Sequence, residues 1–127
     1  KNIVDSLYEI KPPFNVSRPA LFAASAALKD TSWLNKEISH VRSWSKKLYD
    51  FFKKLDIHTN KTSVNFLLIN FDRVKKTSKQ VFFELAKKGI LLRQMDVYSI
   101  KNSLRVTVGN NKENLKLISE LKKIFNV

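Results

Sequence analysis

The chain has 127 residues, with 24 lysines and arginines against 11 aspartates and glutamates, which gives a formal net charge of +13. It has no cysteine and two widely separated histidines, which excludes disulfides and thiolate zinc sites and disfavours a metal cage. Its two glycines, Gly89 and Gly109, are too few for a glycine-rich phosphate loop. No apolar run is long enough to span a membrane and the start lacks a signal peptide, so we expect a cytoplasmic protein.

Two short helices are expected first. Apolar residues at helical spacing predict a helix over residues 2–10, which Pro12 and Pro13 end because neither has an amide proton. Ser17 is then a suitable N-cap, and Pro19 suits the first turn of an alanine-rich helix that continues to residue 28. So many alanines on one helix indicate a close neighbour.

A third, longer helix is expected to run to about Leu55, capped at its start by Asp30, Thr31 or Ser32. Its apolar positions keep a heptad-like spacing: Leu34, Ile38, Val41, Leu48, Phe52 and Leu55. Trp33, Trp44 and Phe51 widen that stripe, which indicates a helix laid on a sheet or against another domain. More apolar faces are predicted than one small sheet can cover, so we expect an exposed apolar patch or self-association.

Three strands are expected in the second half of the chain. Residues 63–71 (SVNFLLINF) predict a largely apolar strand, residues 90–92 a short one, and residues 103–108 (SLRVTV) a third. A helix beginning at Thr77 or Ser78 and ended by Lys87-Lys88-Gly89 separates the first two. The order β-α-β-β-α after three helices predicts a single α+β domain, with helices on a small antiparallel three-stranded sheet.

The final helix follows Gly109 and Asn110. Its inward residues are expected to be Leu115, Ile118, Leu121 and Phe125.

The basic residues form scattered pairs and no single block, which favours solvated helix faces over a nucleic-acid-binding stripe. A basic nucleic-acid-binding α+β module stays open as an alternative class. His40 in the long helix and His58 in a polar loop are interpreted as ordinary surface or half-buried histidines, because no motif aligns them with a nucleophile.

Two arginines are the strongest candidates for a functional role. Arg93 ends one predicted strand, and Arg105 interrupts an otherwise uncharged one. A guanidinium in an apolar strand requires an anionic partner, because burying it unpaired is costly. That partner is either a structural Asp or Glu or a bound carboxylate or phosphate, whose oxygens the planar fork matches. The residues alone leave both interpretations open.

The runs KPPFNVS, SVNFLLI and GILLR…Y…NSLRVTVGNNKEN resemble the C-terminal part of histidinol-phosphate aminotransferases over nearly the whole chain. The resemblance implies the small domain of the aspartate-aminotransferase fold. In that family the arginine of the LRVTVG-type motif binds the substrate α-carboxylate, which corresponds to Arg105. The arginine of the GILLR-type motif lies near the phosphate in histidinol-phosphate enzymes and corresponds to Arg93. Asn65 and Tyr98 match family positions for which packing is the preferred interpretation, and Ser99 stands where the family often has glycine.

The resemblance also implies pyridoxal phosphate in the intact enzyme, glutamate and 2-oxoglutarate as one substrate pair, and a phosphorylated or aromatic amino-acid substrate. The lysine that binds the cofactor lies in a motif that none of these residues resembles, on a large domain N-terminal to them. We therefore expect the chain, which begins at Lys1 and not at methionine, to be the C-terminal small domain of a larger, homodimeric enzyme. Alone it is expected to be inactive and to bind no cofactor. An aromatic amino acid aminotransferase is the alternative within the family.

Overall fold

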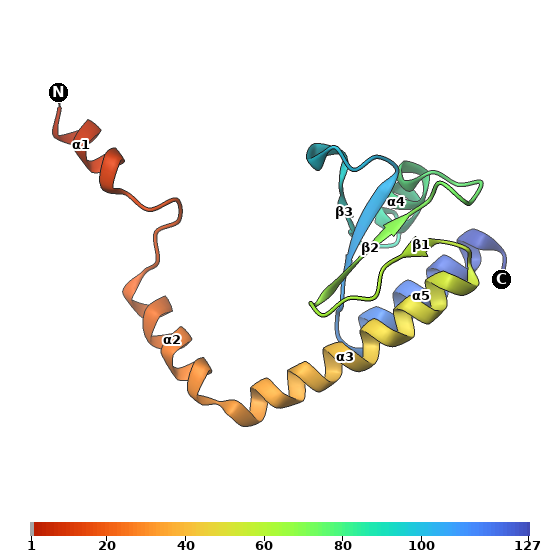
Figure 1. Ribbon diagram of the computed structural model, residues 1–127, viewed down its shortest axis with the longest axis horizontal. Helices are drawn as coiled ribbons and strands as arrows, with labels where there is room; N and C mark the ends of the chain where they lie inside the picture. Colours follow the sequence, from red (N-terminus) through yellow and green to blue (C-terminus); the bar gives the residue numbers. More distant parts are fainter. Residues whose placement is uncertain (1) are drawn as a thin grey trace. The chain divides into compact units, whose positions relative to one another are not determined.

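Local caps begin the first two helices of the computed structural model, which describes residues 2–127 (Figure 1). Helix α1 (Ile3–Ile10) ends just before Pro12 and Pro13. Helix α2 (Arg18–Lys29) begins after Ser17, whose hydroxyl accepts a hydrogen bond of 3.4 Å from the Ala20 N–H. Both helices and the Ser17 cap confirm the sequence predictions, because a cap depends only on residues within one turn of it.

Helix α3 (Thr31–Lys54) is the long helix that the sequence predicts. Of the three proposed caps, Asp30 is the one used: its carboxylate accepts a 2.9 Å hydrogen bond from the Trp33 N–H. The chain divides into two compact units, the first ending at Lys36 and the second comprising Glu37–Val127, so α3 passes from one into the other.

The first unit exposes most of its apolar side chains. No residue of α1 or α2 is buried. The exposed large apolar residues are Ile3, Val4, Leu7, Tyr8, Ile10, Phe14, Val16, Leu21, Phe22, Leu28, Trp33 and Leu34. The three aromatic residues expected on a widened face of α3 differ from one another. Trp33 is exposed, Phe51 is half-buried, and Trp44 is buried in the core, where its indole N–H donates to Asn111 Oδ1 at 2.6 Å.

The second unit is built on one antiparallel sheet in the order β1-β2-β4-β3. Its strands are β1 (His58–Thr59), β2 (Phe66–Asn70), β3 (Arg93–Gln94) and β4 (Ser103–Thr107). The predicted α+β class and antiparallel pairing are confirmed, with four strands in place of three. Strand β1 is the additional one, and it places His58 in a strand where a loop was expected.

The predicted strand over residues 90–92 is wrong, because the strand begins later, at Arg93. Helix α4 (Ser78–Ala86) is capped by Thr77 and closes at Gly89, which has a positive φ of 71°. The Ile90 N–H then donates to the Leu85 carbonyl at 3.0 Å, which completes the end of the helix. Ile90 is therefore part of the helix terminus and cannot begin a strand.

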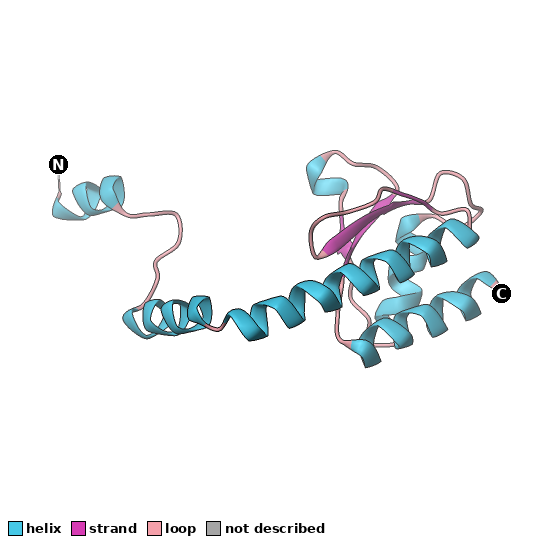
Figure 2. Cartoon of the chain, turned by 60° about the horizontal axis from the view of Figure 1, so that its bottom comes forward, coloured by secondary structure: helices cyan, strands magenta, loops and turns pink. Residues whose placement is uncertain are grey.

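Three helices and the sheet share one core. Leu67, Ile69, Leu104 and Val106 alternate on one face of β2 and β4 and are buried. The cluster also contains Leu48 and Phe52 of α3, Val81 and Leu85 of α4, Leu117 and Leu121 of α5 (Asn111–Phe125), and Trp44, Ile57 and Phe71. Figure 2 shows the second half of α3 running beside α5, where His40 Nε2 lies 2.9 Å from the Gly109 carbonyl oxygen.

The inward face of α5 differs from the prediction at one position. Leu115 is 58 % exposed, and Leu117 is buried in its place. The face is set by Asn114, a buried polar residue whose side chain bonds both backbone groups of Gly109, at 3.0 Å and 2.7 Å. Because Asn114 is polar, a prediction based on apolar spacing alone leaves it out. The predicted inward face therefore lies part of a turn away from the observed one. In residues 2–127 no helix is long and apolar enough to cross a membrane.

Candidate anion-binding site

The two candidate arginines lie directly opposite each other in the sheet. Strands β3 and β4 pair so that Arg93 faces Arg105. Residues opposite each other in an antiparallel pair share a face, with Cβ atoms about 4.5–5.5 Å apart, and two like charges placed in this way repel. Their face is the one opposite to Leu104 and Val106, and so opposite to the core. An anion bound between the two guanidinium groups would relieve the repulsion.

Arg105 is half-buried in the middle of β4. Its Nε atom is buried and has no hydrogen-bond partner. Its guanidinium carbon lies 5.0 Å from the centroid of the Phe66 ring on β2, within the range of a cation–π interaction. A buried N–H donor without a partner is rare in folded proteins and requires an explanation, and a bound anion would supply the missing partner.

Arg93 is exposed on the edge strand β3 and contacts Tyr98 in two ways. Its Nη2 donates a hydrogen bond to the Tyr98 hydroxyl, and its guanidinium carbon lies 5.4 Å from the centroid of the same ring. Tyr98 belongs to the short 3₁₀ turn η1 (Asp96–Tyr98) and is 52 % exposed. Sequence reasoning assigned it only packing, so this contact was missed. The one available signal was a tyrosine five residues after the arginine, beside a turn.

In the part of the chain that the structure describes, neither arginine takes part in an ion pair, whereas Lys46–Asp50, Lys76–Glu84 and Lys123–Glu120 each form one. Both arginines line one open cavity of about 770 Å³, together with Thr107, Lys116 and Glu113, whose carboxylate accepts a 2.8 Å hydrogen bond from the Asn110 N–H and pairs with neither arginine. Of the two partners that the sequence left open, a structural carboxylate is therefore not the one observed. The site can receive a carboxylate or a phosphate.

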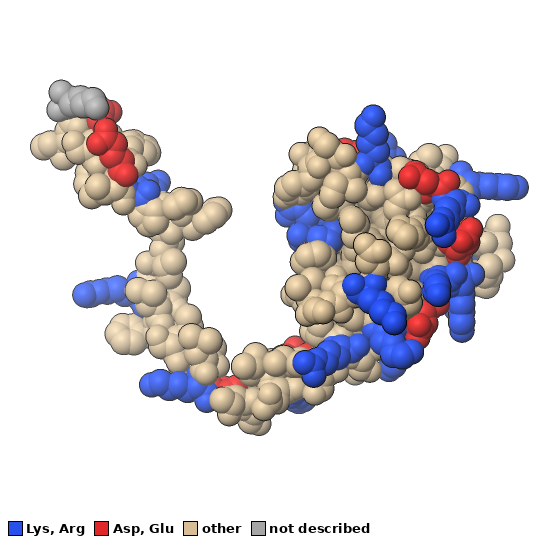
Figure 3. Space-filling view, viewed as in Figure 1, with Lys and Arg blue, Asp and Glu red and all other residues tan. Residues whose placement is uncertain are grey.

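The remaining basic residues are more dispersed. A second cavity of about 540 Å³ is lined by Arg42, Lys46, Lys53 and Lys61, and Lys46 there is paired with Asp50 at 2.6 Å. Figure 3 shows lysine and arginine side chains spread over one face of the second unit, with acidic side chains among them. Such a mixed surface agrees with solvated faces better than with a nucleic-acid-binding stripe.

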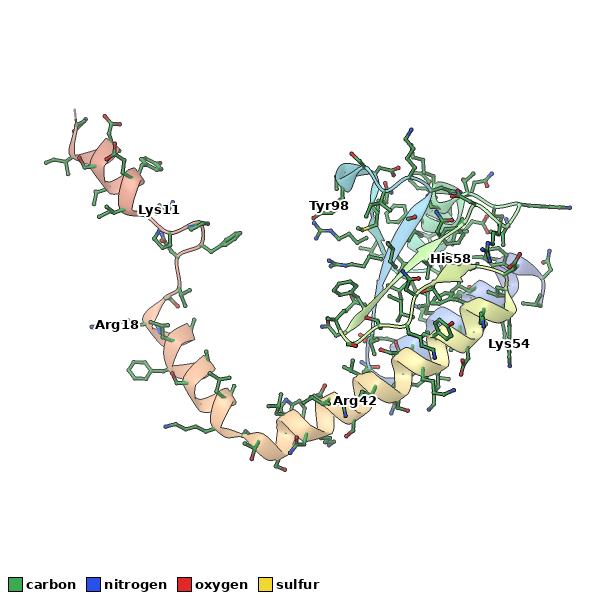
Figure 4. All side chains as sticks on the ribbon, viewed as in Figure 1. Lys11, Arg18, Arg42, Lys54, His58 and Tyr98 are labelled. Atoms are coloured by element: carbon green, nitrogen blue, oxygen red, sulfur yellow. The ribbon has the colours of Figure 1, made fainter. Side chains whose placement is uncertain are left out.

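Neither histidine lies at the arginine pair. His40 contacts the Gly109 backbone, and His58 is exposed on β1 (Figure 4). Among residues 2–127 no group of His, Asp and Glu side chains could hold a metal ion. Asn65 contributes its backbone carbonyl, which accepts a 2.8 Å hydrogen bond from the Val108 N–H just beyond the β2–β4 pairing.

A family model described as aminotransferase class I and II matches residues 1–121. The chain belongs to this family. It is 43% identical to the histidinol-phosphate aminotransferase of Pelagibacter ubique over 127 residues, which are 99% of the chain and 35% of that protein. It is 38% identical to the enzyme of that name from Nitrobacter hamburgensis over 114 residues, 89% of the chain and 31% of that protein. The chain thus spans about a third of the length of the curated relatives it matches.

Solved structures show the same fold at low sequence identity. The histidinol-phosphate aminotransferase of Clostridium acetobutylicum has a TM-score of 0.78 at 21% identity, covering 98% of the chain and 38% of that protein. The enzyme of that name from Sinorhizobium meliloti, solved in complex with pyridoxal-5'-phosphate, has a TM-score of 0.79 at 18% identity. The match covers 96% of the chain and 34% of that protein. These matches confirm the aminotransferase fold that the sequence resemblance implies.

Proposed function

We propose that the chain is the small-domain part of a pyridoxal-phosphate-dependent aminotransferase that transfers an amino group between histidinol phosphate and 2-oxoglutarate. The observation that carries this proposal is the pair Arg93 and Arg105, opposite each other on one face with no carboxylate partner in the described residues. The histidinol-phosphate aminotransferases among its relatives, at 43% and 38% identity, support the choice of substrate.

Each arginine is assigned one anionic group. Arg105 binds the α-carboxylate of the amino-acid substrate, glutamate included, and Arg93 binds the phosphate of histidinol phosphate. A guanidinium offers a planar pair of N–H donors that matches two oxygens of either anion, which a lysine ammonium does not. Because the two arginines are neighbours in the sheet, the carboxylate and phosphate sites adjoin. That arrangement suits an enzyme whose two substrates occupy the same place in turn.

The chain's own part in catalysis is to bind and orient the substrate. When bound in the intact enzyme, pyridoxal phosphate supplies the electron sink for amino transfer. Ser45-Lys46 and Ser78-Lys79 lie in helices without nearby glycine, Lys46 is paired with Asp50, and neither pair resembles the family's cofactor motif. The cofactor therefore belongs to the large domain in this proposal, and the arginines fix where the substrate's anionic end lies relative to it. A homodimer in the cytoplasm remains the expected form of the enzyme.

The experiment that tests the proposal is Arg93→Ala in the full-length enzyme. The specificity constant kcat/KM should fall by about ten- to a hundredfold for histidinol phosphate, because a charge-assisted contact to its phosphate is lost. It should fall much less for glutamate. Equal losses for histidinol phosphate and for an aromatic amino acid would contradict the assignment. They would make Arg93 a structural residue and place aromatic amino acids first as substrates.

A further inference from the structure

Arg93 lies where its side chain has little packing to hold it. It is exposed, on a strand of two residues, at the edge of the sheet. An arginine side chain free to sample its rotamers loses conformational entropy when a ligand orders it. A residue that orders the guanidinium before the ligand arrives would remove much of that cost.

Tyr98 has the contacts to do this. Its hydroxyl accepts a hydrogen bond from Arg93 Nη2, and its ring lies 5.4 Å from the guanidinium carbon. The hydrogen bond fixes the direction of one N–H, and the ring restricts the position of the guanidinium group. These contacts use one of the five guanidinium donors, so the others remain available to a bound anion.

The turn that carries Tyr98 is itself held by its backbone. The Tyr98 N–H donates to the Met95 carbonyl at 2.9 Å, and the Ser99 N–H donates to the Asp96 carbonyl at 2.9 Å. The Ile100 N–H also reaches the Met95 carbonyl, at 3.3 Å. Figure 4 shows Tyr98 in this turn, beyond the end of β3. The tyrosine is thus presented to Arg93 from a closed, hydrogen-bonded loop.

We propose that Tyr98 is a positioning residue that orients the Arg93 guanidinium for the phosphate of the substrate. This inference rests on the proposed function, because it takes the phosphate as the ligand of Arg93. Tyr98 acts through Arg93, so it sets the affinity for phosphorylated substrates and does not alter the handling of the α-carboxylate at Arg105.

The test is Tyr98→Phe in the full-length enzyme, which keeps the ring and removes the hydroxyl. KM for histidinol phosphate should rise about five- to tenfold with kcat nearly unchanged, as expected when a hydrogen bond that orders the binding group is lost. The inhibition constant of inorganic phosphate should rise by a similar factor, and KM for glutamate should stay within about twofold. Tyr49→Phe is the matched control, because Tyr49 also has a cation over its ring, Lys53 at 5.9 Å, but lies on α3. It should change none of these constants.

A double-mutant cycle separates positioning from direct contact with the ligand. If Tyr98 acts only through Arg93, Tyr98→Phe should cost nothing further in an Arg93→Ala background. Tyr98→Phe kinetics equal to wild type on histidinol phosphate and inorganic phosphate would overturn the proposal, as would equal losses on glutamate. A full additional loss in the Arg93→Ala background would also overturn it. If Arg93→Ala shows no loss specific to histidinol phosphate, the proposed function itself is wrong. If Arg93→Ala shows that loss but Tyr98→Phe leaves KM for histidinol phosphate unchanged, only the positioning role is wrong.

Discussion

Arg105→Lys in the full-length enzyme tests whether the half-buried arginine serves the substrate or the fold. The substitution keeps the positive charge but replaces the planar fork by a single ammonium group. If Arg105 holds an α-carboxylate through two hydrogen bonds, the variant loses one of them. A hydrogen bond to a charged group contributes about 1.5–3 kcal/mol. This converts to a loss of about ten- to 150-fold in kcat/KM for every substrate with an α-carboxylate, glutamate included.

The same substitution should leave the fold intact. Arg105 Nε is buried without a hydrogen-bond partner, and a lysine side chain has no N–H at that position. An unpaired buried donor costs about 1–3 kcal/mol, so its removal offsets any packing that the guanidinium loses against Phe66. The free energy of unfolding should therefore stay at the wild-type value or rise.

The assay is steady-state kinetics with glutamate as amino donor, together with urea unfolding of the same preparations. Arg73→Lys is the matched control, because Arg73 is exposed in the loop between β2 and α4 and should change neither quantity. An unchanged kcat/KM for glutamate would refute the reasoning. A loss of activity accompanied by a comparable loss of stability would refute it too, because Arg105 would then be a structural residue.

Two further predictions concern the loops that flank the site. Ser99 has a positive φ of 60°, a left-handed conformation that glycine adopts without strain. Ser99→Gly should therefore raise the free energy of unfolding, measured in urea, by about 0.5–1 kcal/mol. A free energy of unfolding equal to or below that of wild type would contradict this. The pKa of the Asp72 carboxyl lies below its ordinary value, chiefly because Asn102 Nδ2 donates to it at 2.7 Å. A lowered pKa in the folded state means that the carboxylate stabilises the fold at neutral pH and that this contribution is lost as the pH falls through the folded pKa. The difference in unfolding free energy between wild type and Asp72→Ala should therefore shrink in that acidic range, whereas a difference that does not vary with pH would contradict the assignment.

The sequence predicted the helices well because their signals are local. Ser17, Asp30 and Thr77 cap helices, and Gly89 ends one, through hydrogen bonds or backbone angles set within a single turn. The errors occur where a distant contact decides. No periodicity in α3 reveals that the Trp44 indole N–H donates to Asn111, 67 residues away. Strand β1 has two residues and exists only because it pairs with β2.

The candidate residues could be named from the sequence, but their arrangement could not. The strand pattern put Arg93 at the end of one strand and Arg105 within another, without the register between the strands. That register depends on the connection, which contains a 3₁₀ turn and two residues with left-handed backbone angles, Ser99 and Asn102. Adding or removing one residue there would move one arginine to the other face of the sheet.

The neighbours of the two arginines explain how a repulsive pair can remain ready for a ligand. Each guanidinium lies near one aromatic ring, Arg105 near Phe66 and Arg93 near Tyr98. A cation–π contact contributes about 0.5–1 kcal/mol at an exposed site, which offsets part of the repulsion between the two charges. A carboxylate partner would offset it more fully, but a substrate anion would then have to displace that carboxylate. Aromatic neighbours restrain the two cations while leaving most of their N–H donors free, and this combination suits the carboxylate and phosphate sites proposed for them.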